Sequence, residues 1–276
     1  MNSRYWKFTA LFAAVAMIAA CATVPVTGRT QLRIISPSVM LSMSQQQYGQ
    51  FIEENTLSSD AESTAMVHDV GTNIQKAVER YFNERGWGHE LSHYDWEFNL
   101  IESDEVNAWC MPGGKIAVYE GLLPVTQDEN GLAVVIGHEI GHAVAGHGAE
   151  RMSHLLAVQL GGIGLAVAMA SRPQATQQLW FAAFGLGAQV GFILPYSRLQ
   201  EYEADRLGLI FIAMAGYDPE HALSFWERLA AEKEGKAPPE FLSTHPTDTS
   251  RINQIRTLMP EARRYYEEYQ RTAPAS

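Results

Sequence analysis

The sequence contains very few cysteines, which excludes a fold stapled by disulfides. Only Cys21 and Cys110 occur in 276 residues, whereas small secreted domains that rely on disulfides have many closely spaced cysteines. A lipid on Cys21, argued below, would leave Cys110 as the single free thiol. Because Cys110 lies between Trp109 and Met111, with no histidine beside it, we interpret it as a structural thiol rather than a nucleophile.

Basic residues are also scarce relative to acidic ones. The chain has 20 Lys and Arg against 31 Asp and Glu, a formal net charge of -11, and an acidic surface repels phosphate backbones. The sequence also lacks a basic stripe interleaved with aromatic residues, so we expect no nucleic-acid partner. With 46% hydrophobic residues, the chain can bury the core of one sizeable globular domain.

The N-terminal residues are typical of a secretory signal rather than of a folded element. Arg4 and Lys7 precede an apolar run, Phe8–Ala20, that is too short for a comfortable membrane span. The run ends in Ile18-Ala19-Ala20-Cys21, which resembles the bacterial lipobox, whose cysteine is diacylated and becomes the mature N-terminus. We therefore predict a lipoprotein signal peptide over residues 1–20 and lipidation of Cys21.

The residues after Cys21 suggest where such an anchor would sit. A polar, proline-containing segment follows, and we assign residues 21–38 to a tether. By the same resemblance, Ala22 rather than an aspartate after the cysteine favours the outer membrane. The predicted location is thus the periplasmic face of the outer membrane. An ordinary signal peptide, or a short anchor helix that happens to end in cysteine, is the alternative.

Most of the remaining chain, residues 39–276, shows the periodicity of helices. Val67, Val70, Ile74 and Val78 recur at spacings of three and four, which predicts helix within 39–85. Thr126-Gln127-Asp128-Glu129 has the form of a capping box, so we expect a helix to start near Gln127. The further helices are expected at 127–151, 198–215, 219–234, 248–258 and 260–270.

A short part of the chain has strand character. Apolar and polar residues alternate from Tyr94 to Leu100, which indicates a half-buried strand. Asn107–Met111 and Lys115–Tyr119 flank Pro112-Gly113-Gly114, a turn sequence that predicts a hairpin. Together with the helices, these segments predict an α+β fold that is mainly helical and has a small antiparallel sheet.

An apolar insertion at 155–195 interrupts this pattern. Leu155–Ser171 and Leu179–Pro195 are rich in Gly and Ala, and a polar link, Arg172–Gln178, joins them. Each stretch has about 17 residues, the low edge of a spanning helix, and contains a glutamine. We predict a helical hairpin that is buried in protein or touches a membrane, with a true membrane span as the alternative.

The most informative motif is His138-Glu139-Ile140-Gly141-His142, an HExxH sequence inside an expected helix. Side chains four residues apart lie one above the other on a helix face, so His138 and His142 can bind one zinc ion. Glu139 lies one step round the helix, where it can take a proton from a metal-bound water without being a ligand. A solvated helix with two histidines is the alternative.

A catalytic zinc needs a third protein ligand and an open position for water. His147 is badly placed to be this ligand. It follows His138 by nine residues, which puts it about half a helical turn away from the face that carries His138 and His142. Glu201 is the better candidate, with Asp205 four residues later on the same helix face. One carboxylate would bind zinc and the other would accept a hydrogen bond from a ligand imidazole. An ordinary charged helix is the alternative.

These motifs resemble the gluzincin metallopeptidases that include HtpX, the CAAX prenyl proteases and the periplasmic proteases LoiP and BepA. The resemblance rests on blocks in the right order: Asn107-Ala108 with Pro112–Gly114, Gly121–Leu123, His138–His142, Ser197-Arg198 with Glu201–Asp205, and His245-Pro246 with Arg251. It implies a zincin-type domain with the HExxH helix at its centre, one Zn2+ held by His138, His142 and Glu201, and Glu139 as general base. Few convincing membrane spans make the chain more similar to the LoiP and BepA branch.

The remaining site residues follow from the chemistry of peptide hydrolysis. The tetrahedral oxyanion needs a donor besides zinc, and His245, on a proline-bracketed loop, is our candidate. The same histidine could instead close over the zinc as a fourth ligand and keep the enzyme latent, or simply cap the next helix. Peptide capture by backbone pairing would use Asn107–Met111 or Lys115–Tyr119 as the receiving strand, with Asn107, Gly113 and Gly114 binding substrate.

The sequence therefore predicts a zinc endopeptidase of the bacterial envelope that cleaves unfolded or misfolded proteins, since backbone pairing is mostly independent of sequence. Two alternatives stay open at this stage. One is a periplasmic chaperone or assembly factor that uses the zinc site mainly to bind clients. The other is a membrane-integrated peptidase that acts on membrane proteins.

Overall fold

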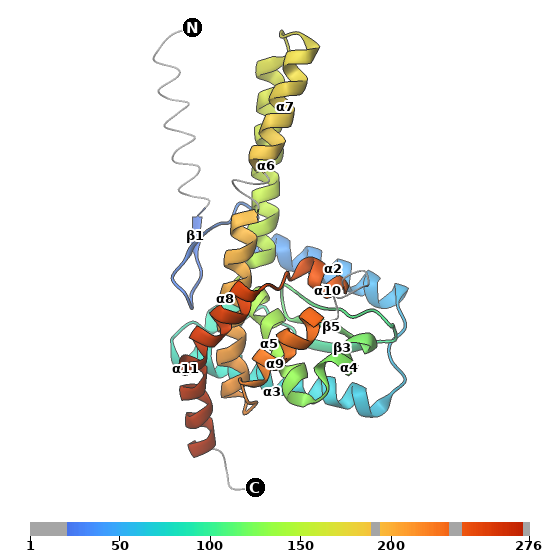
Figure 1. Cartoon of the computed structure of the whole chain (residues 1–276), viewed down its shortest axis with the longest axis vertical. Helices are drawn as coiled ribbons and strands as arrows, with labels where there is room; N and C mark the ends of the chain where they lie inside the picture. Colours follow the sequence, from blue (N-terminus) through green and yellow to red (C-terminus); the bar gives the residue numbers. More distant parts are fainter. Residues whose placement is uncertain (1–20, 189–193, 232–238, 273–276) are drawn as a thin grey trace. The chain divides into compact units, whose positions relative to one another are not determined.

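The computed structural model describes residues 21–188, 194–231 and 239–272 (Figure 1). The predicted signal peptide, 1–20, lies outside these residues. The chain divides into two compact units, one formed by 1–40 with 146–197 and the other by 41–145 with 198–276. We call them the hairpin unit and the peptidase unit.

The peptidase unit is mainly helical around a small sheet. Its helices are α2 (Pro37–Glu54, continuing from the hairpin unit), α3 (Ala61–Glu84), α4 (Leu123–Thr126), α5 (Glu129–Val144), α8 (Leu194–Met214, also shared), α9 (His221–Ala231), α10 (Glu240–Thr244) and α11 (Thr249–Thr272), with short 3-10 turns at Gly88–Leu91 and Glu120–Leu122. The helix α5 is buried from Gly131 to Ala143. The expected mainly helical α+β fold is confirmed.

The sheet of the peptidase unit is mixed rather than antiparallel. Its strands, β3 (Glu97–Ile101), β4 (Ala108–Met111) and β5 (Lys115–Tyr119), lie in the order β3-β5-β4. The predicted hairpin of β4 and β5 is present, but β3 pairs with β5 in parallel. The chain reverses twice after β3, and β5 inserts between the other two strands, so β3 and β5 run in the same direction.

The predicted capping box does not start α5. Gln127 ends α4 in a left-handed conformation with φ 71°, and the Thr126 hydroxyl donates to the Leu123 carbonyl at 2.9 Å. Asp128 is the N-cap instead, because its side chain accepts from the Gly131 amide at 2.9 Å. A left-handed Gly146, φ +72°, then separates α5 from the next helix. The single helix expected at 127–151 is therefore wrong.

The two helices expected at 248–258 and 260–270 form one continuous helix, α11, with Pro260 inside it. Proline removes one backbone donor and usually kinks or ends a helix. Here Met259 and Ala262, on either side of it, are both buried. Tertiary packing of this face thus outweighs the local cost of the proline.

The hairpin unit begins with two short strands where we expected a tether. Strands β1 (Cys21–Thr23) and β2 (Thr30–Leu32) pair antiparallel. Just before β2, the Arg29 guanidinium donates to both oxygens of the buried Glu150 carboxylate at 2.7 and 2.8 Å. This ion pair holds the segment against the first turn of α6 (His147–Met169). The proposed domain boundaries themselves stay a prediction.

Two long helices make up most of the remaining described part of this unit. They are α6 (His147–Met169) and α7 (Gln174–Ala188), which run antiparallel as a helical hairpin (Figure 1). In the described part of the chain, α6 alone is long and apolar enough to cross a membrane, and 11% of its apolar window is buried. Of the two predicted settings, burial within this chain is absent from Leu155 to Phe184, where no residue is buried. The last part of the predicted hairpin, 185–195, has no described side chains.

Candidate metal centre

The helices α5 and α8 cross at very short range, and glycines make this possible. A Cβ atom on Gly141 would lie 2.7 Å from the Ala204 carbonyl oxygen, and one on Gly208 would lie 2.8 Å from the His138 amide nitrogen. Real Cβ contacts of this length essentially do not occur, so larger residues would push the helices apart. The close approach brings the carboxylates of α8 beside the histidines of α5.

Four buried residues meet at this crossing: His138, His142, Glu201 and His245, each offering one ligand atom, all within 4.8 Å of one another. The Nε2 atom of His138 lies 3.1 Å from His142 Nε2 and 3.4 Å from Glu201 Oε2. His245 Nδ1 lies 3.2 Å from His138 Nε2 and 3.1 Å from Glu201 Oε2. Ligand atoms of a tetrahedral zinc ion lie roughly 3.3–3.6 Å apart. The donor set and its spacing therefore fit zinc.

The structure thus brings together the two histidines of HExxH and the carboxylate that we expected as the third ligand. The neighbouring Glu203 is also buried but lies outside the four-residue cluster. His147 is outside it as well, at the start of α6. The place of Glu203 agrees with the helix-face argument. His147 is excluded for a different reason, since α5 ends at Val144 and His147 belongs to the next helix.

A buried arginine completes the surroundings of the cluster. The Arg251 guanidinium, on α11, donates to both oxygens of Asp205 at 2.8 Å and lies 3.1 Å from Glu201 Oε2. Its Cζ atom sits 3.5 Å from the centre of the Trp226 ring. Sequence reasoning assigned no role to Arg251, although it is part of the last family block. Arg251 is far from the HExxH motif along the chain, so no local spacing could predict that it lies beside the metal ligands.

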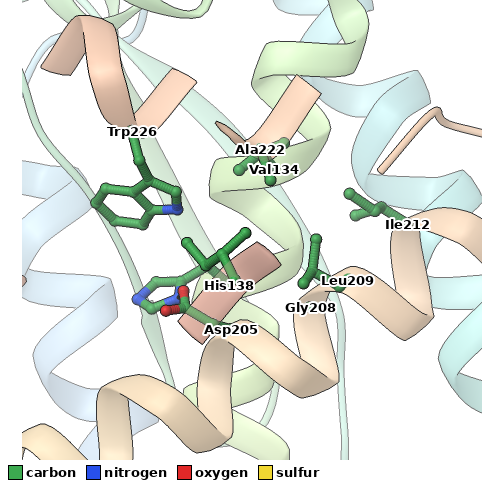
Figure 2. A pocket seen from close by; sticks show the side chains of 9 residues that line it. Val134, His138, Asp205, Gly208, Leu209, Ile212, Ala222 and Trp226 are labelled. Atoms are coloured by element: carbon green, nitrogen blue, oxygen red, sulfur yellow. Dashed lines mark ion pairs between the residues drawn. The ribbon is translucent and has the colours of Figure 1, made fainter. Parts of the chain in front are cut away.

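Asp205 links this arginine to the metal cluster. Its Oδ1 atom lies 2.9 Å from His138 Nδ1, so the carboxylate can accept a hydrogen bond from the Nδ1–H group and leave Nε2 facing the cluster. Figure 2 shows the Asp205 carboxylate beside the His138 ring, with Trp226 nearby. A small, mostly apolar pocket adjoins the two side chains. It is lined by Ile255 and by five residues that Figure 2 labels: Val134, Gly208, Leu209, Ile212 and Ala222. Water is thus largely kept from the back of His138.

Burial and neighbouring charges shift the pKa values of the residues in and beside the cluster. Burial lowers the pKa of His138, but hydrogen bonds to Asp205 and Glu201 outweigh it and raise the pKa to about 9. Burial raises the pKa of Glu201, yet the charge of His142 and contacts with the other histidines hold it well below its ordinary value. The pKa of Asp205 is lowered in the same way by Arg251. Without a metal, His138 therefore holds a proton that a bound cation replaces.

Glu139 and His245 face each other beside the cluster. His245 Nε2 lies 3.2 Å from Glu139 Oε1, while its Nδ1 atom points at Glu201 and His138. His245 follows α10 directly, and its ring packs on Phe241 with centroids 4.6 Å apart. Of the roles considered for His245, this geometry favours the fourth-ligand position over that of a free oxyanion donor.

The structure also distinguishes between the two strands considered for peptide capture. The strand β5 is central and paired on both sides, so Lys115–Tyr119 cannot receive a further strand. Our proposal for that strand is wrong, because β5 inserts between β3 and β4. The strand β4 is at the edge of the sheet, Asn107 directly precedes it, and Gly113 and Gly114 form its turn with φ 91° and 85°.

Cys110, in β4, is half-buried. Burial and the charge of Glu139 raise the pKa of its thiol well above the ordinary value. A thiol in this setting is a poor nucleophile, because nucleophilic attack needs the thiolate. The edge strand β4 also packs against α5, which carries the two histidines of the cluster.

The model of the peptidase family M48 matches residues 70–259, a segment that includes all four residues of the cluster. The chain belongs to peptidase family M48. This M48 chain is 32% identical over 240 residues to the mitochondrial metalloendopeptidase OMA1 of Schizosaccharomyces pombe. The aligned residues are 87% of the chain and 66% of that relative. The human metalloendopeptidase OMA1, mitochondrial, is 31% identical over 247 residues, 86% of the chain and 46% of the relative.

A bacterial relative matches a smaller share. The β-barrel assembly-enhancing protease of Escherichia coli O157:H7 is 33% identical over 172 residues, 60% of the M48 chain and 35% of the relative. The chain spans between 35% and 66% of the length of these three relatives. The expected family is confirmed. The finer assignment to the LoiP and BepA branch stays a prediction, because the OMA1 matches extend over more of the chain.

Proposed function

We propose that this M48 chain is a zinc-dependent endopeptidase. The observation that carries the proposal is the buried set of His138, His142 and Glu201, with ligand atoms spaced for one tetrahedral cation. These three residues would hold one zinc ion per subunit. When bound, zinc supplies a Lewis acid that polarises the scissile carbonyl and activates the attacking water.

The other residues of the site have separate tasks in this proposal. Glu139 accepts the proton of the attacking water and passes it to the nitrogen of the leaving amine. Asp205 holds the Nδ1 proton of His138, which keeps Nε2 of the ring directed at the ligand cluster. Arg251 offsets the negative charge of the two α8 carboxylates and fixes the orientation of Asp205.

We propose further that His245 keeps the site latent. Its Nδ1 atom occupies the fourth corner of the cluster, where a catalytic site needs an open position for water. Movement of the loop after α10 would free that position. Replacement His245→Ala is then expected to keep zinc and to cleave unfolded casein several-fold faster than the unaltered chain. A fall of about 100-fold would instead support the alternative role as oxyanion donor.

Substrates are proposed to be unfolded or misfolded envelope proteins. The strand β4 is at the edge of the sheet in the described part of the chain, where it can offer backbone groups to an extended peptide, and such pairing depends little on side chains. The lipobox-like sequence and the exposed position of Cys21 support a lipid anchor and a location at the periplasmic face of the outer membrane. These statements on anchor, compartment and substrate are proposals, and fractionation of cells with Cys21→Ala tests the anchor.

The enzymatic proposal is tested by comparing the full chain with its Glu139→Gln variant. Both are expected to contain one zinc per chain by elemental analysis, because Glu139 is not a ligand. Casein cleavage is expected to fall at least 100-fold in the variant, since the proton transfer is lost. Equal cleavage by the two proteins would reject the peptidase. Equal and negligible cleavage together with zinc-dependent casein binding would support the alternative of a chaperone or assembly factor.

A further inference from the structure

The hairpin of α6 and α7 presents an unusual apolar surface. Seven of the eleven large hydrophobic side chains that are exposed in the described chain lie on it: Leu155, Leu160, Ile163, Val167, Leu179, Trp180 and Phe181. Val167 is 75% exposed and Leu179 is 73% exposed. A surface of this size on one element indicates a partner that the peptidase mechanism does not use.

The same segment is almost free of charge. From residue 152 to residue 197 the only Asp, Glu, Lys or Arg is Arg172, at the tip of the hairpin. By contrast, 18% of the whole chain is charged. Because ionised side chains are excluded from hydrocarbon far more strongly than from protein surfaces, this depletion favours a lipid environment.

The distribution of polar residues around α6 excludes a helix that lies flat on a membrane or a protein. Between Leu155 and Met169 the only polar side chain is Gln159, so α6 has no polar face. A helix in the interfacial plane or in a protein groove is apolar on one side and polar on the other. A helix that is apolar all round lies inside a core or a bilayer, and α6 is not inside a core.

The two helices also pack as membrane helices do. A Cβ atom on Gly161 would lie 3.1 Å from the Phe184 ring, so a small residue on α6 admits a large one from α7. The apolar part of α6, Leu155–Met169, is about 22 Å long at 1.5 Å per residue, which spans most of the ~30 Å hydrocarbon layer of a bilayer. Polar residues gather at the tip, beside Arg172, where the headgroups of a membrane would begin.

We infer that the α6–α7 hairpin inserts into the hydrocarbon interior of a lipid bilayer, as a second attachment independent of any lipid on Cys21. The exposed apolar residues then face acyl chains, and Arg172 reaches a headgroup layer. The inference is independent of catalysis. It is therefore tested on the full chain carrying Glu139→Gln, and its failure would leave the casein assay unaffected.

The test places a polarity-sensitive fluorophore at Ile163→Cys, with Val39→Cys as the matched control, both in a chain whose own thiols are removed by Cys21→Ala and Cys110→Ala. Both native side chains are large, apolar and exposed, at 57% and 49%, but Val39 lies in α2. With vesicles of phosphatidylethanolamine and phosphatidylglycerol, we expect the Ile163→Cys label to shift to the blue and to be quenched by lipids with spin-labelled acyl chains. The control label is expected to report water. Water-like emission from both labels would overturn the inference.

A second comparison distinguishes a lipid bilayer from a second copy of the chain as the partner of the hairpin. Adding Val167→Glu is expected to raise the lipid concentration needed for half-maximal quenching of the Ile163→Cys label about 10-fold, because it places a carboxylate in the hydrocarbon near the headgroup layer at Arg172, whereas Val39→Glu leaves that concentration unchanged. Both positions are exposed, so circular dichroism should show the same fold. A different result would identify a second copy of the chain as the occupant and overturn the inference. In that case the emission of the Ile163→Cys label would shift to the blue as the protein concentration rises without vesicles, and adding lipid would not change it.

Discussion

Arg251 shows how much the metal centre depends on one residue outside the HExxH motif. It is 2% exposed and bridges two carboxylates and an aromatic ring. Two buried carboxylates near an imidazole cluster would repel one another without a fixed positive charge. The arginine therefore stabilises the empty site before any cation binds.

Replacing Arg251 with methionine should lower the free energy of unfolding of the zinc-free chain by about 3–5 kcal/mol, because buried carboxylates lose their partner. Urea unfolding at pH 7 measures the change. Arg256→Met is the matched control on the same helix, since Arg256 pairs with Glu227 at a surface where both are 53% exposed, and it should cost under about 1 kcal/mol. Equal losses for both variants would contradict this account of Arg251.

The raised pKa of His138 predicts a pH dependence of the zinc-free chain. Its pKa rises from 6.5 to about 9, despite burial, because of Asp205 and Glu201. The bound proton stabilises the native state fully below pH 6.5, and this contribution is lost as the pH rises through 9. Urea unfolding in EDTA should show a loss of about 3 kcal/mol at most over this range. His138→Gln should remove the dependence, and an unchanged slope in that variant would refute it.

The crossing of α5 and α8 determines the site at the scale of elements. Neither helix contains a complete zinc site, since α5 carries two histidines and α8 carries the carboxylates. Gly141 and Gly208 allow the backbones to approach closely enough for one cation to be held by both helices. These two glycines, one on each helix, therefore have a structural task distinct from that of the ligands.

Substituting Gly141 with alanine should separate the two helices and weaken zinc binding. The new methyl group would lie 2.7 Å from a backbone carbonyl of Ala204, and such overpacking typically costs about 1–3 kcal/mol. Zinc titration and urea unfolding measure both effects. Gly164→Ala, at a helical position with nothing within 4 Å, should be neutral or slightly stabilising. Unaltered zinc affinity in Gly141→Ala would count against close helix approach as the cause.

At the scale of the whole molecule, zinc should couple the distant segments that supply the site. The ligand residues come from α5, α8 and the loop after α10, so a cation binds the native chain and not the unfolded one. Free zinc at 100 times its Kd should raise the free energy of unfolding by about 2.7 kcal/mol. Calorimetry of the chain with and without zinc measures this, and His138→Ala should show no such gain. A gain in that variant would mean that zinc binds elsewhere.

Local patterns explain which parts of the molecule the sequence predicts well. The helix-face spacing of His138 and His142, and of Glu201 and Asp205, is a property of the helix alone, and these side chains do meet at one cluster. The periodicity within 39–85 likewise corresponds to α2 and α3. Boundaries were less predictable. The capping-box pattern at Thr126 predicted the start of a long helix, but the positive φ of Gln127 ends α4 at this point. Pro260 predicted a break between two helices, but the packing of its neighbours keeps α11 continuous.

The sequence by itself determined the chemistry of this protein: an HExxH helix, a paired carboxylate helix and an apolar hairpin, because each is a pattern of neighbouring residues on one element. Tertiary structure alone decided three features: the parallel pairing of β3 with β5, the contact of Arg251 with Glu201, and the place of His245 among the four possible metal ligands. His245 lies 107 residues from His138 along the chain. Contacts over such separations depend on how all the elements pack together, which no local spacing encodes.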